Sequence, residues 1–160
     1  MNPSVEDRLN SVVRAIGGVI LPALPESASL AREQAMLAMG HIQIILGQLP
    51  ATAQFEADEA KDIHRLGTAV AELTTGGVRA RSTADALSAM LSHATFAESS
   101  SRTRRVQDAI NAVLLALVED GDPDATNAVH ATILEHGAAR ALKDRQWFAA
   151  MGFDSDFCTR

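Results

Sequence analysis

Residues 106–134, VQDAINAVLLALVEDGDPDATNAVHATIL, decide the fold that this sequence predicts. The apolar residues of the first half recur every three or four positions, as on one face of an α-helix. They are Val106, Ile110, Val113, Leu114, Leu117 and Val118. Gly121 is expected to end this helix, and Asp122-Pro123 opens the next, because proline suits the first helical turn. The stretch therefore predicts two consecutive helices. The apolar residues of the first cover an arc of its surface that is too broad for contact with only one neighbouring helix.

The same helical spacing continues through most of the chain, and no segment keeps a period of two. The sequence predicts an all-α fold, a single compact bundle of six to seven mostly antiparallel helices. Gly137 either ends the sixth helix or lies inside one longer helix that reaches Met151. We expect residues 1–160 to form one domain, with 138–160 a C-terminal helix and tail that close the bundle. The expected helices are 2–21, 30–49, 52–75, 82–98, 102–120 and one that starts at 123.

Composition narrows the class of protein. The chain has 160 residues, 47% hydrophobic and 21% charged, which is typical of a globular domain rather than a disordered one. Its formal net charge of −6 disfavours nucleic-acid binding, because like charges repel the phosphate backbone. No apolar run is long enough to span a membrane, and the start lacks the basic and apolar regions of a signal peptide. We expect a cytoplasmic protein, and the excess of arginine and alanine suggests a bacterial one.

Motifs of common enzymes and cofactor sites are missing from the sequence. There is no phosphate-binding loop, no dinucleotide-binding glycine pattern and no nucleophile elbow. The five histidines never lie three or four residues apart, so a metal centre is not expected, and no cofactor is predicted. An enzyme needs a nucleophile or base with a positioned partner. No such pair can be named, so the sequence indicates no catalytic residue and favours a non-enzymatic role.

A polar stripe on the second expected helix is the first candidate site. Gln34, His41 and Gln48 are spaced by seven and fall among apolar residues, opposite the side of Arg32 that we expect to face solvent. Glu59 projects into the apolar stripe of the next helix. These four residues form either the polar floor of a small-ligand pocket or a set of interhelical hydrogen bonds. If Glu59 faces His41, the two form an acid/base or ion pair.

Two arginine-rich stretches, GGVRARST and SSSRTRR, form the second candidate site. Each precedes or opens an expected helix, where backbone amides and the helix dipole favour anions. If the two stretches lie at the same end of the bundle, they could hold a phosphate or a carboxylate. Otherwise they are solvated linkers with local ion pairs. The arginines are Arg79, Arg81, Arg102, Arg104 and Arg105.

Aromatic residues gather at the C-terminus, in KDRQWFAAMGFDSDFCTR. Trp147 is expected to close one end of a core of small side chains, and Phe153 to fold back onto Phe148 after Gly152. The tail is therefore read as a plug for the fold, with a dimer contact as the alternative. The roles of Phe157 and Cys158 are open.

Residues 20–46, ILPALPESASLAREQAMLAMGHIQIIL, resemble a class of small uncharacterised all-helical bacterial proteins. Those proteins have a helix that ends in a Pro-Ala-Leu turn, then a helix with a histidine near its middle. They are encoded near acyl-CoA dehydrogenase-like and aminoglycoside phosphotransferase-like enzymes. The resemblance implies an accessory role in acyl-thioester metabolism and carries no catalytic residue over.

Two functional hypotheses follow. The first is a non-enzymatic accessory or interaction protein that acts as a homodimer, because the helices have apolar faces wider than one seam. The alternative is a protein that binds a small acyl, carboxylate- or phosphate-bearing ligand in a polar pocket between helices.

Overall fold

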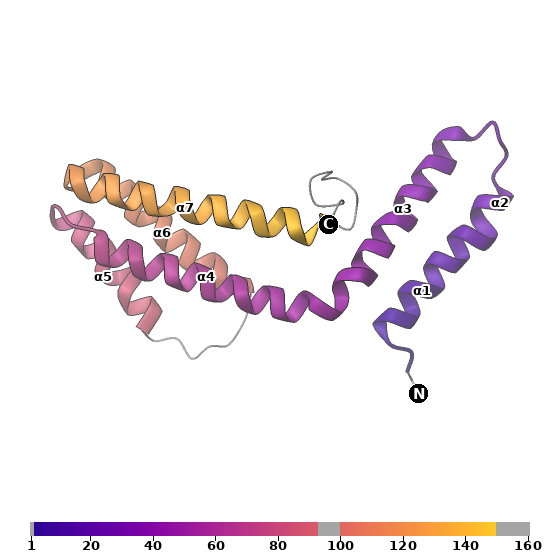
Figure 1. Cartoon of the computed structure of the whole chain (residues 1–160), viewed down its shortest axis with the longest axis horizontal. Coiled ribbons are helices and arrows are strands. Elements are labelled where there is room, and N and C mark those ends of the chain that lie inside the picture. The colour runs from indigo at the N-terminus through magenta and orange to yellow at the C-terminus, as the bar shows by residue number, and fades with distance from the viewer. Residues whose placement is uncertain (1, 93–99, 150–160) are drawn as a thin grey trace. The chain divides into compact units, whose positions relative to one another are not determined.

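The computed structural model describes residues 2–92 and 100–149, and its regular structure there is helical apart from one backbone bridge between Gly76 and Gly121. The predicted all-α class is confirmed. The chain divides into two compact units, Met1–Ala53 (unit 1) and Gln54–Arg160 (unit 2). That 1–160 form a single domain stays a prediction. Figure 1 shows the helices in chain order.

The described residues form five continuous helical segments, so the predicted count of six to seven was wrong. Pro50 lies in a 3-10 turn that joins two expected helices instead of separating them, because proline is tolerated in a first helical turn. Gly137 lies inside one helix rather than at its end. The segments are α1 (Val5–Ala15) with η1 (Ile16–Ile20) and α2 (Leu21–Ala23); α3 (Ser29–Gln48) with η2 (Leu49–Ala51) and α4 (Thr52–Leu73); α5 (Val78–Ser92); α6 (Ser100–Asp120); and α7 (Pro123–Trp147).

Unit 1 is a helical hairpin, in which the segment α1–η1–α2 packs against α3. Ser4 caps α1, which begins three residues later than predicted: the Ser4 hydroxyl accepts a hydrogen bond from the Asp7 N–H at 3.0 Å. The helix continues past the expected stop at Leu21, because a π-helical turn precedes Pro22 and rearranges the hydrogen bonds there.

A close helix approach and one arginine hold the hairpin together. A Cβ on Gly17 would lie only 3.3 Å from the Met39 sulfur, so glycine lets the two helices come close. Arg32 donates hydrogen bonds of 3.0 Å to the carbonyl oxygens of Leu21 and Leu24, at the end of α2. The Leu21 carbonyl also accepts a bond of 3.3 Å from the Leu24 N–H. The expectation that Arg32 faces solvent was therefore wrong.

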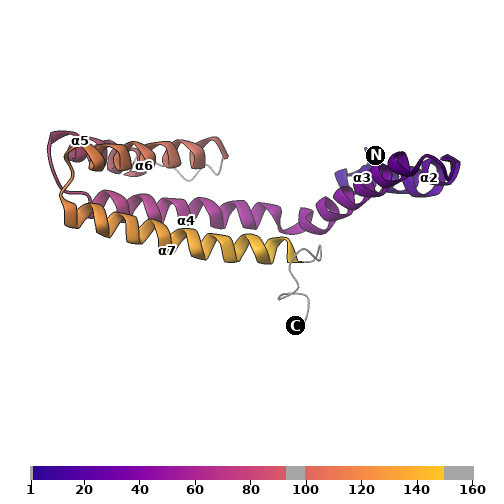
Figure 2. The ribbon, with the colours of Figure 1, turned by 90° about the horizontal axis from the view of Figure 1, so that it is seen from above.

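Unit 2 holds all of the buried apolar side chains found in the described residues. Its four helices form two layers, α4 beside α7 and α5 beside α6 (Figures 1 and 2). Residues of α4, α5, α6 and α7 meet between the layers, and the largest fully buried side chains are Leu87, Val70, Val113 and Val129. The arc predicted on residues 106–118 is only partly buried, since Val118 remains 75% exposed.

Two turns at one end of unit 2 are tied by backbone hydrogen bonds. Gly77 N–H donates to the Asp120 carbonyl at 2.7 Å, and Asp122 N–H donates to the Thr75 carbonyl at 3.0 Å. Gly76 has a φ of +147°, and a Cβ there would lie 2.5 Å from the Asp120 oxygen, so only glycine fits. The α4–α5 turn and the α6–α7 turn therefore form one structural element.

Helix α5 begins four residues earlier than predicted, at Val78 instead of Ser82. Ser82, the first residue of the predicted helix, does not cap α5. Instead, the Asp120 carboxylate accepts hydrogen bonds from the N–H groups of Arg79 and Ala80, each at 2.8 Å. Asp120, 40 residues after Ala80 in the sequence, thus acts as the N-cap of α5. A contact over that distance could not be predicted from local sequence.

Candidate functional site

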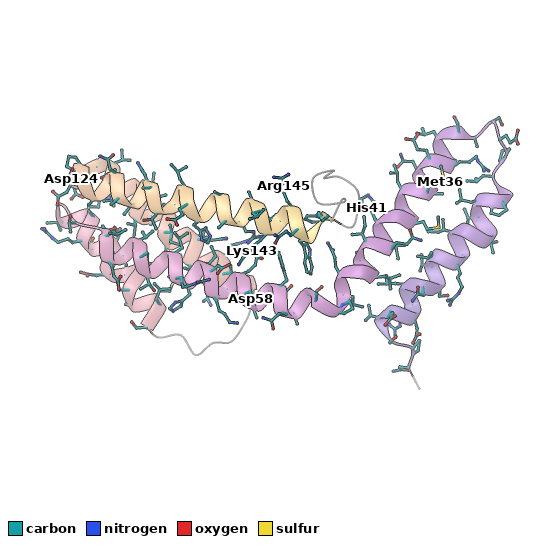
Figure 3. All side chains as sticks on the ribbon, viewed as in Figure 1. Met36, His41, Asp58, Asp124, Lys143 and Arg145 are labelled. Carbon is teal, nitrogen blue, oxygen red and sulfur yellow. The ribbon has the colours of Figure 1, made fainter. Side chains whose placement is uncertain are left out.

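The residues of the predicted polar stripe lie in different units. Gln34, His41 and Gln48 belong to α3 of unit 1, whereas Glu59 belongs to α4 of unit 2. Gln34 and His41 are exposed and Gln48 is half-buried, so the stripe does not lie in a core of unit 1. Met36 and His41 are labelled on α3 in Figure 3. The apolar neighbours of the stripe are also exposed, Leu30 at 69% and Leu37 at 49%.

Helix α3 carries apolar side chains on several sides but lacks buried residues, and its polar side chains lie among them. One row, Arg32, Ala35, Met39, Ile42 and Leu46, is half-buried along the hairpin contact. A second row, Ala31, Ala38 and Ile45, is exposed beside it and spaced by seven. In globular proteins, an apolar row on a helix normally faces other apolar side chains. In a single copy of unit 1, the first row of α3 is partly covered by the other arm of the hairpin, whereas the second row remains exposed to solvent.

Helix α1 and the turn after it carry a matching exposed row, Val5, Val12 and Val19, which are 60%, 45% and 67% exposed. These residues are also spaced by seven, so they lie along one side of the helix. Viewed along each helix from its N-terminus, both rows lie on the same rotational side of the hairpin contact. Because the two helices are antiparallel, the two rows border the same face of the hairpin. We call this face, lined by Val5, Val12, Val19, Ala31, Ala38 and Ile45, the hairpin face. None of these six residues is charged, but the exposed Arg8 lies three residues after Val5 and four before Val12 and therefore borders the α1 row.

The predicted arginine site is not assembled. Arg79 and Arg81 lie at the start of α5, next to the end of α6, whereas Arg102, Arg104 and Arg105 lie at the start of α6. About 15 residues of helix at 1.5 Å each, or more than 20 Å, separate the two groups. The amides at the start of α5 are already occupied by Asp120, and Arg79 pairs with Glu119 at 2.7 Å. Asp120 and Glu119 therefore already occupy the part of the predicted anion site at the start of α5.

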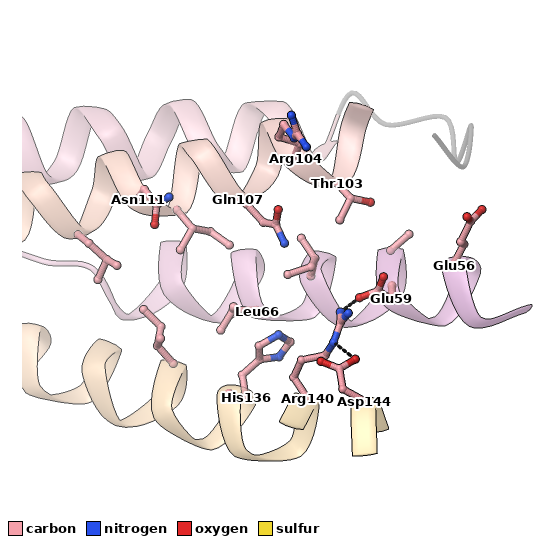
Figure 4. A pocket seen from close by; sticks show the side chains of 16 residues that line it. Glu56, Glu59, Leu66, Thr103, Arg104, Gln107, Asn111, His136, Arg140 and Asp144 are labelled. Atoms are coloured by element: carbon pink, nitrogen blue, oxygen red, sulfur yellow. Dashed lines mark hydrogen bonds and ion pairs between the residues drawn. The ribbon is translucent and has the colours of Figure 1, made fainter. Parts of the chain in front are cut away.

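Unit 2 has a cleft of about 620 Å³ between α4, α6 and α7 (Figure 4). Of its polar lining residues, Glu59 and Arg104 were predicted from the sequence as site residues, each for another site. Its floor is apolar and includes the buried Ile63, Leu66 and Ile110. The walls carry polar groups from three helices, which only the tertiary structure brings together. They are Glu56, Glu59, Thr103, Arg104, Gln107, Asn111, His136, Arg140 and Asp144.

Arg140 organises one end of the cleft. Its guanidinium group pairs with the Glu59 carboxylate of α4 and, through Nε at 2.9 Å, with the Asp144 carboxylate of its own helix (Figure 4). The side chain is 36% exposed and lies 5.8 Å over the ring of Phe55. The inward Glu59 therefore has a cation partner, which is one of the options open for a carboxylate on an apolar stripe.

A second charged contact joins α4 and α7 beside the cleft. Asp62 of α4 accepts hydrogen bonds from Lys143 of α7 and from Arg65. Burial disfavours ionisation of Asp62, but the hydrogen bonds from Lys143 and Arg65 outweigh it, so the pKa of this carboxyl is lowered. Figure 3 shows Lys143 on α7 and Asp58 on α4 near this contact.

Trp147 closes the open end of the α4–α7 pair. Its ring stacks on Phe55 with the centroids 4.2 Å apart and the planes 24° apart. This contact agrees with the expected structural role of the tryptophan. Met151, Gly152, Phe153, Phe157 and Cys158 lie outside the described residues, so the proposed fold-back onto Phe148 and the plug stay predictions.

The comparisons with known proteins supply no relative. No family model matches the chain, and neither the curated proteins nor the solved structures contain a similar one. No helix in the described residues is both long and apolar enough to cross a bilayer. Those residues likewise hold no cluster of three or more histidine, cysteine or acidic side chains able to bind a metal ion. Function has to be argued from the hairpin face and the cleft.

Proposed function

We propose that this protein acts by association, as a homodimer in which the hairpin faces of two copies pack together into a four-helix bundle. One observation carries the proposal: the described residues of unit 1 contain no buried side chain, although they include long apolar rows. A two-helix hairpin without a core cannot offset the conformational entropy of folding. A surface that covers the face would supply the missing burial.

A second copy of the chain is the occupant that suits the hairpin face. Both rows are spaced by seven and run antiparallel, so a two-fold rotation can set the α1 row of one copy against the α3 row of the other. The six lining residues carry no charge, and the long side chain of Arg8 at the border can direct its guanidinium group away to water. A helical span of 19 residues beside a second helix gives a face of about 28 Å by 20 Å, or roughly 600 Å². That area approaches the ~800 Å² per partner of a specific interface.

The proposal assigns no catalytic step and treats the protein as an accessory or interaction module, consistent with the expected cytoplasmic bacterial setting. In it, unit 1 assembles the dimer and unit 2 provides a folded body with its own core. The accessory role in acyl-thioester metabolism implied by the sequence resemblance is part of the same proposal.

Sedimentation velocity over a range of concentrations tests the dimer. The informative variant is Val12→Glu with Ala38→Glu, which places two charges on the hairpin face at positions that are exposed in a single copy. Burying unpaired charges costs several kcal/mol, so the dimer should weaken by about a hundredfold or more. The matched control is Leu134→Glu, an equally drastic change on α7 of unit 2, where the leucine is 74% exposed.

We expect the wild type and the control to sediment as dimers. The double variant should sediment as a monomer with reduced helicity, because the uncovered hairpin of unit 1 lacks a core whereas unit 2 keeps its own. A wild type that remains monomeric up to millimolar concentration would refute the proposal and indicate that unit 2 or another protein covers the face. Loss of the dimer in the Leu134→Glu control alone would move the interface to unit 2.

A further inference from the structure

The cleft between α4, α6 and α7 has the size and lining of a small-molecule site. Its volume of about 620 Å³ lies within the ~300–1,000 Å³ of typical ligand pockets. The floor consists of isoleucine and leucine side chains from three helices, and the polar groups stand along the walls (Figure 4). An amphipathic molecule could therefore lay an apolar body on the floor and direct its polar group to a wall.

Several wall groups have no partner within the described residues. Gln107 and Asn111 of α6, one turn apart, and His136 of α7 make no hydrogen bond there. Figure 4 shows Gln107 pointing from α6 toward α4 and α7, with His136 on the opposite side of the cleft. Arg140 uses two of its five N–H donors on the Glu59 and Asp144 carboxylates, which leaves donors for another acceptor. The cleft thus offers amide, imidazole and guanidinium hydrogen bonds to an occupant.

The charges of the lining favour an uncharged occupant. Three carboxylates and two guanidinium groups, with histidine counted as neutral, leave a net charge of −1. Arg140 is already balanced by two carboxylates. Arg104 and Glu56, which make no ion pair with another described residue, cancel each other. An anionic head group would meet an excess of negative charge. An ammonium group would give up its hydration for the attraction of a single net charge, which does not offset that cost. This differs from the carboxylate- or phosphate-bearing ligand expected from sequence.

We propose that the cleft of unit 2 binds an uncharged amphipathic small molecule, an apolar chain or ring that bears an amide, carbonyl or hydroxyl group. Its polar group accepts hydrogen bonds from Gln107, Asn111 or Arg140, and its apolar part covers Ile63, Leu66 and Ile110. The site lies wholly in unit 2, so it is independent of the hairpin face and of the dimer.

Titration of the full-length protein with matched probes tests this ligand class. Octanamide, octanoate and octylamine share one alkyl chain and differ in the charge of the head group. Each is followed by the side-chain amide signals of Gln107 and Asn111 in ¹H–¹⁵N NMR spectra. Gln54, whose amide is hydrogen-bonded to Asp58 at 2.9 Å outside the cleft, is the internal control. We expect saturable shifts with octanamide, and binding of octanoate and octylamine at least about tenfold weaker.

Gly137 offers a variant that blocks the cleft without disturbing the fold. It lines the cleft inside α7, and a Cβ added to it would meet nothing within 4 Å. Gly137→Leu should fill part of the cleft and weaken octanamide binding at least about tenfold, while Gly137→Ala should bind as the wild type does. Circular dichroism of both variants checks that α7 is intact.

The outcomes decide the proposal. Shifts confined to Gln107 and Asn111 that Gly137→Leu abolishes would support it. Absence of any saturable shift, equal affinity for octanoate or octylamine, or unchanged binding in Gly137→Leu would overturn it. None of these results depends on the oligomeric state, so a failure here is distinguishable from a failure of the dimer.

Discussion

Replacement of Asp120 by alanine should destabilise unit 2 by about 2 kcal/mol, the upper part of the range for loss of a helix N-cap. The carboxylate accepts two hydrogen bonds of 2.8 Å, from Arg79 N–H and Ala80 N–H. Both donors belong to the first turn of α5, which has no other acceptor for them. Ala80 is fully buried, so water cannot easily replace the lost oxygen. The substitution leaves the Asp120 carbonyl bond to Gly77 in place.

Thermal unfolding followed by circular dichroism, at one fixed protein concentration, measures this loss. For a chain of 160 residues, 2 kcal/mol corresponds to a fall in Tm of about 4–8 °C. Asp120→Asn keeps one acceptor oxygen and should fall between the alanine variant and the wild type. Asp85→Ala is the control on the same helix, because Asp85 is exposed and makes no hydrogen bond or ion pair in the described residues.

The control should stay within about 0.5 kcal/mol of the wild type. If Asp120→Ala also stays within that margin, the carboxylate does not cap α5, and the start of the helix at Val78 must be held in another way. If Asp85→Ala costs as much as Asp120→Ala, the effect is one of helix charge and not of the two hydrogen bonds.

Three further changes test other contacts. Gly76→Ala should lower the free energy of unfolding in urea by at least about 2 kcal/mol. Its φ of +147° disfavours a side chain, and a Cβ would lie 2.5 Å from a carbonyl oxygen. Gly47→Ala in α3 is the control and should raise the free energy of unfolding by about 0.5–1 kcal/mol, because a Cβ there meets nothing within 4 Å. Asp62→Asn should cost less than about 1 kcal/mol at neutral pH. Because the pKa of Asp62 is lower in the folded state, ionised Asp62 contributes its full stabilisation above the ordinary value of 3.8. The difference between Asp62→Asn and the wild type should therefore disappear as pH falls through the folded-state pKa. A difference that does not change with pH would contradict the ion pair. Trp147→Ala removes the stack on Phe55 and should lower stability by about 1–3 kcal/mol. An unchanged Tm would favour the alternative, a dimer contact of the tail.

The all-α class and most helix positions could be predicted from the sequence, because a period of 3.6 is a local property. The stripe of α4 illustrates this: Ile63, Leu66 and Val70 are buried as the spacing requires. Proline and glycine were less reliable guides, because their effect depends on neighbouring structure. Pro50 lies within a continuous helical path, and Gly137 lies inside α7.

The candidate sites could not be predicted in the same way, because they depend on which helices become neighbours. Spacing placed Gln34 and His41 on one side of α3, but that side is exposed in a single copy. Glu59 was recognised as an inward carboxylate, yet its partner Arg140 is 81 residues away and no local pattern connects them.

The sequence by itself determined helices, their apolar rows and the absence of common catalytic motifs, since each follows from residue type and short-range spacing. Only the tertiary structure decided that buried apolar side chains gather in unit 2, that Asp120 caps α5, and that α4, α6 and α7 enclose a cleft. The physical reason is that a helix face has no intrinsic partner: packing selects it, and with it the polar groups that come to lie together.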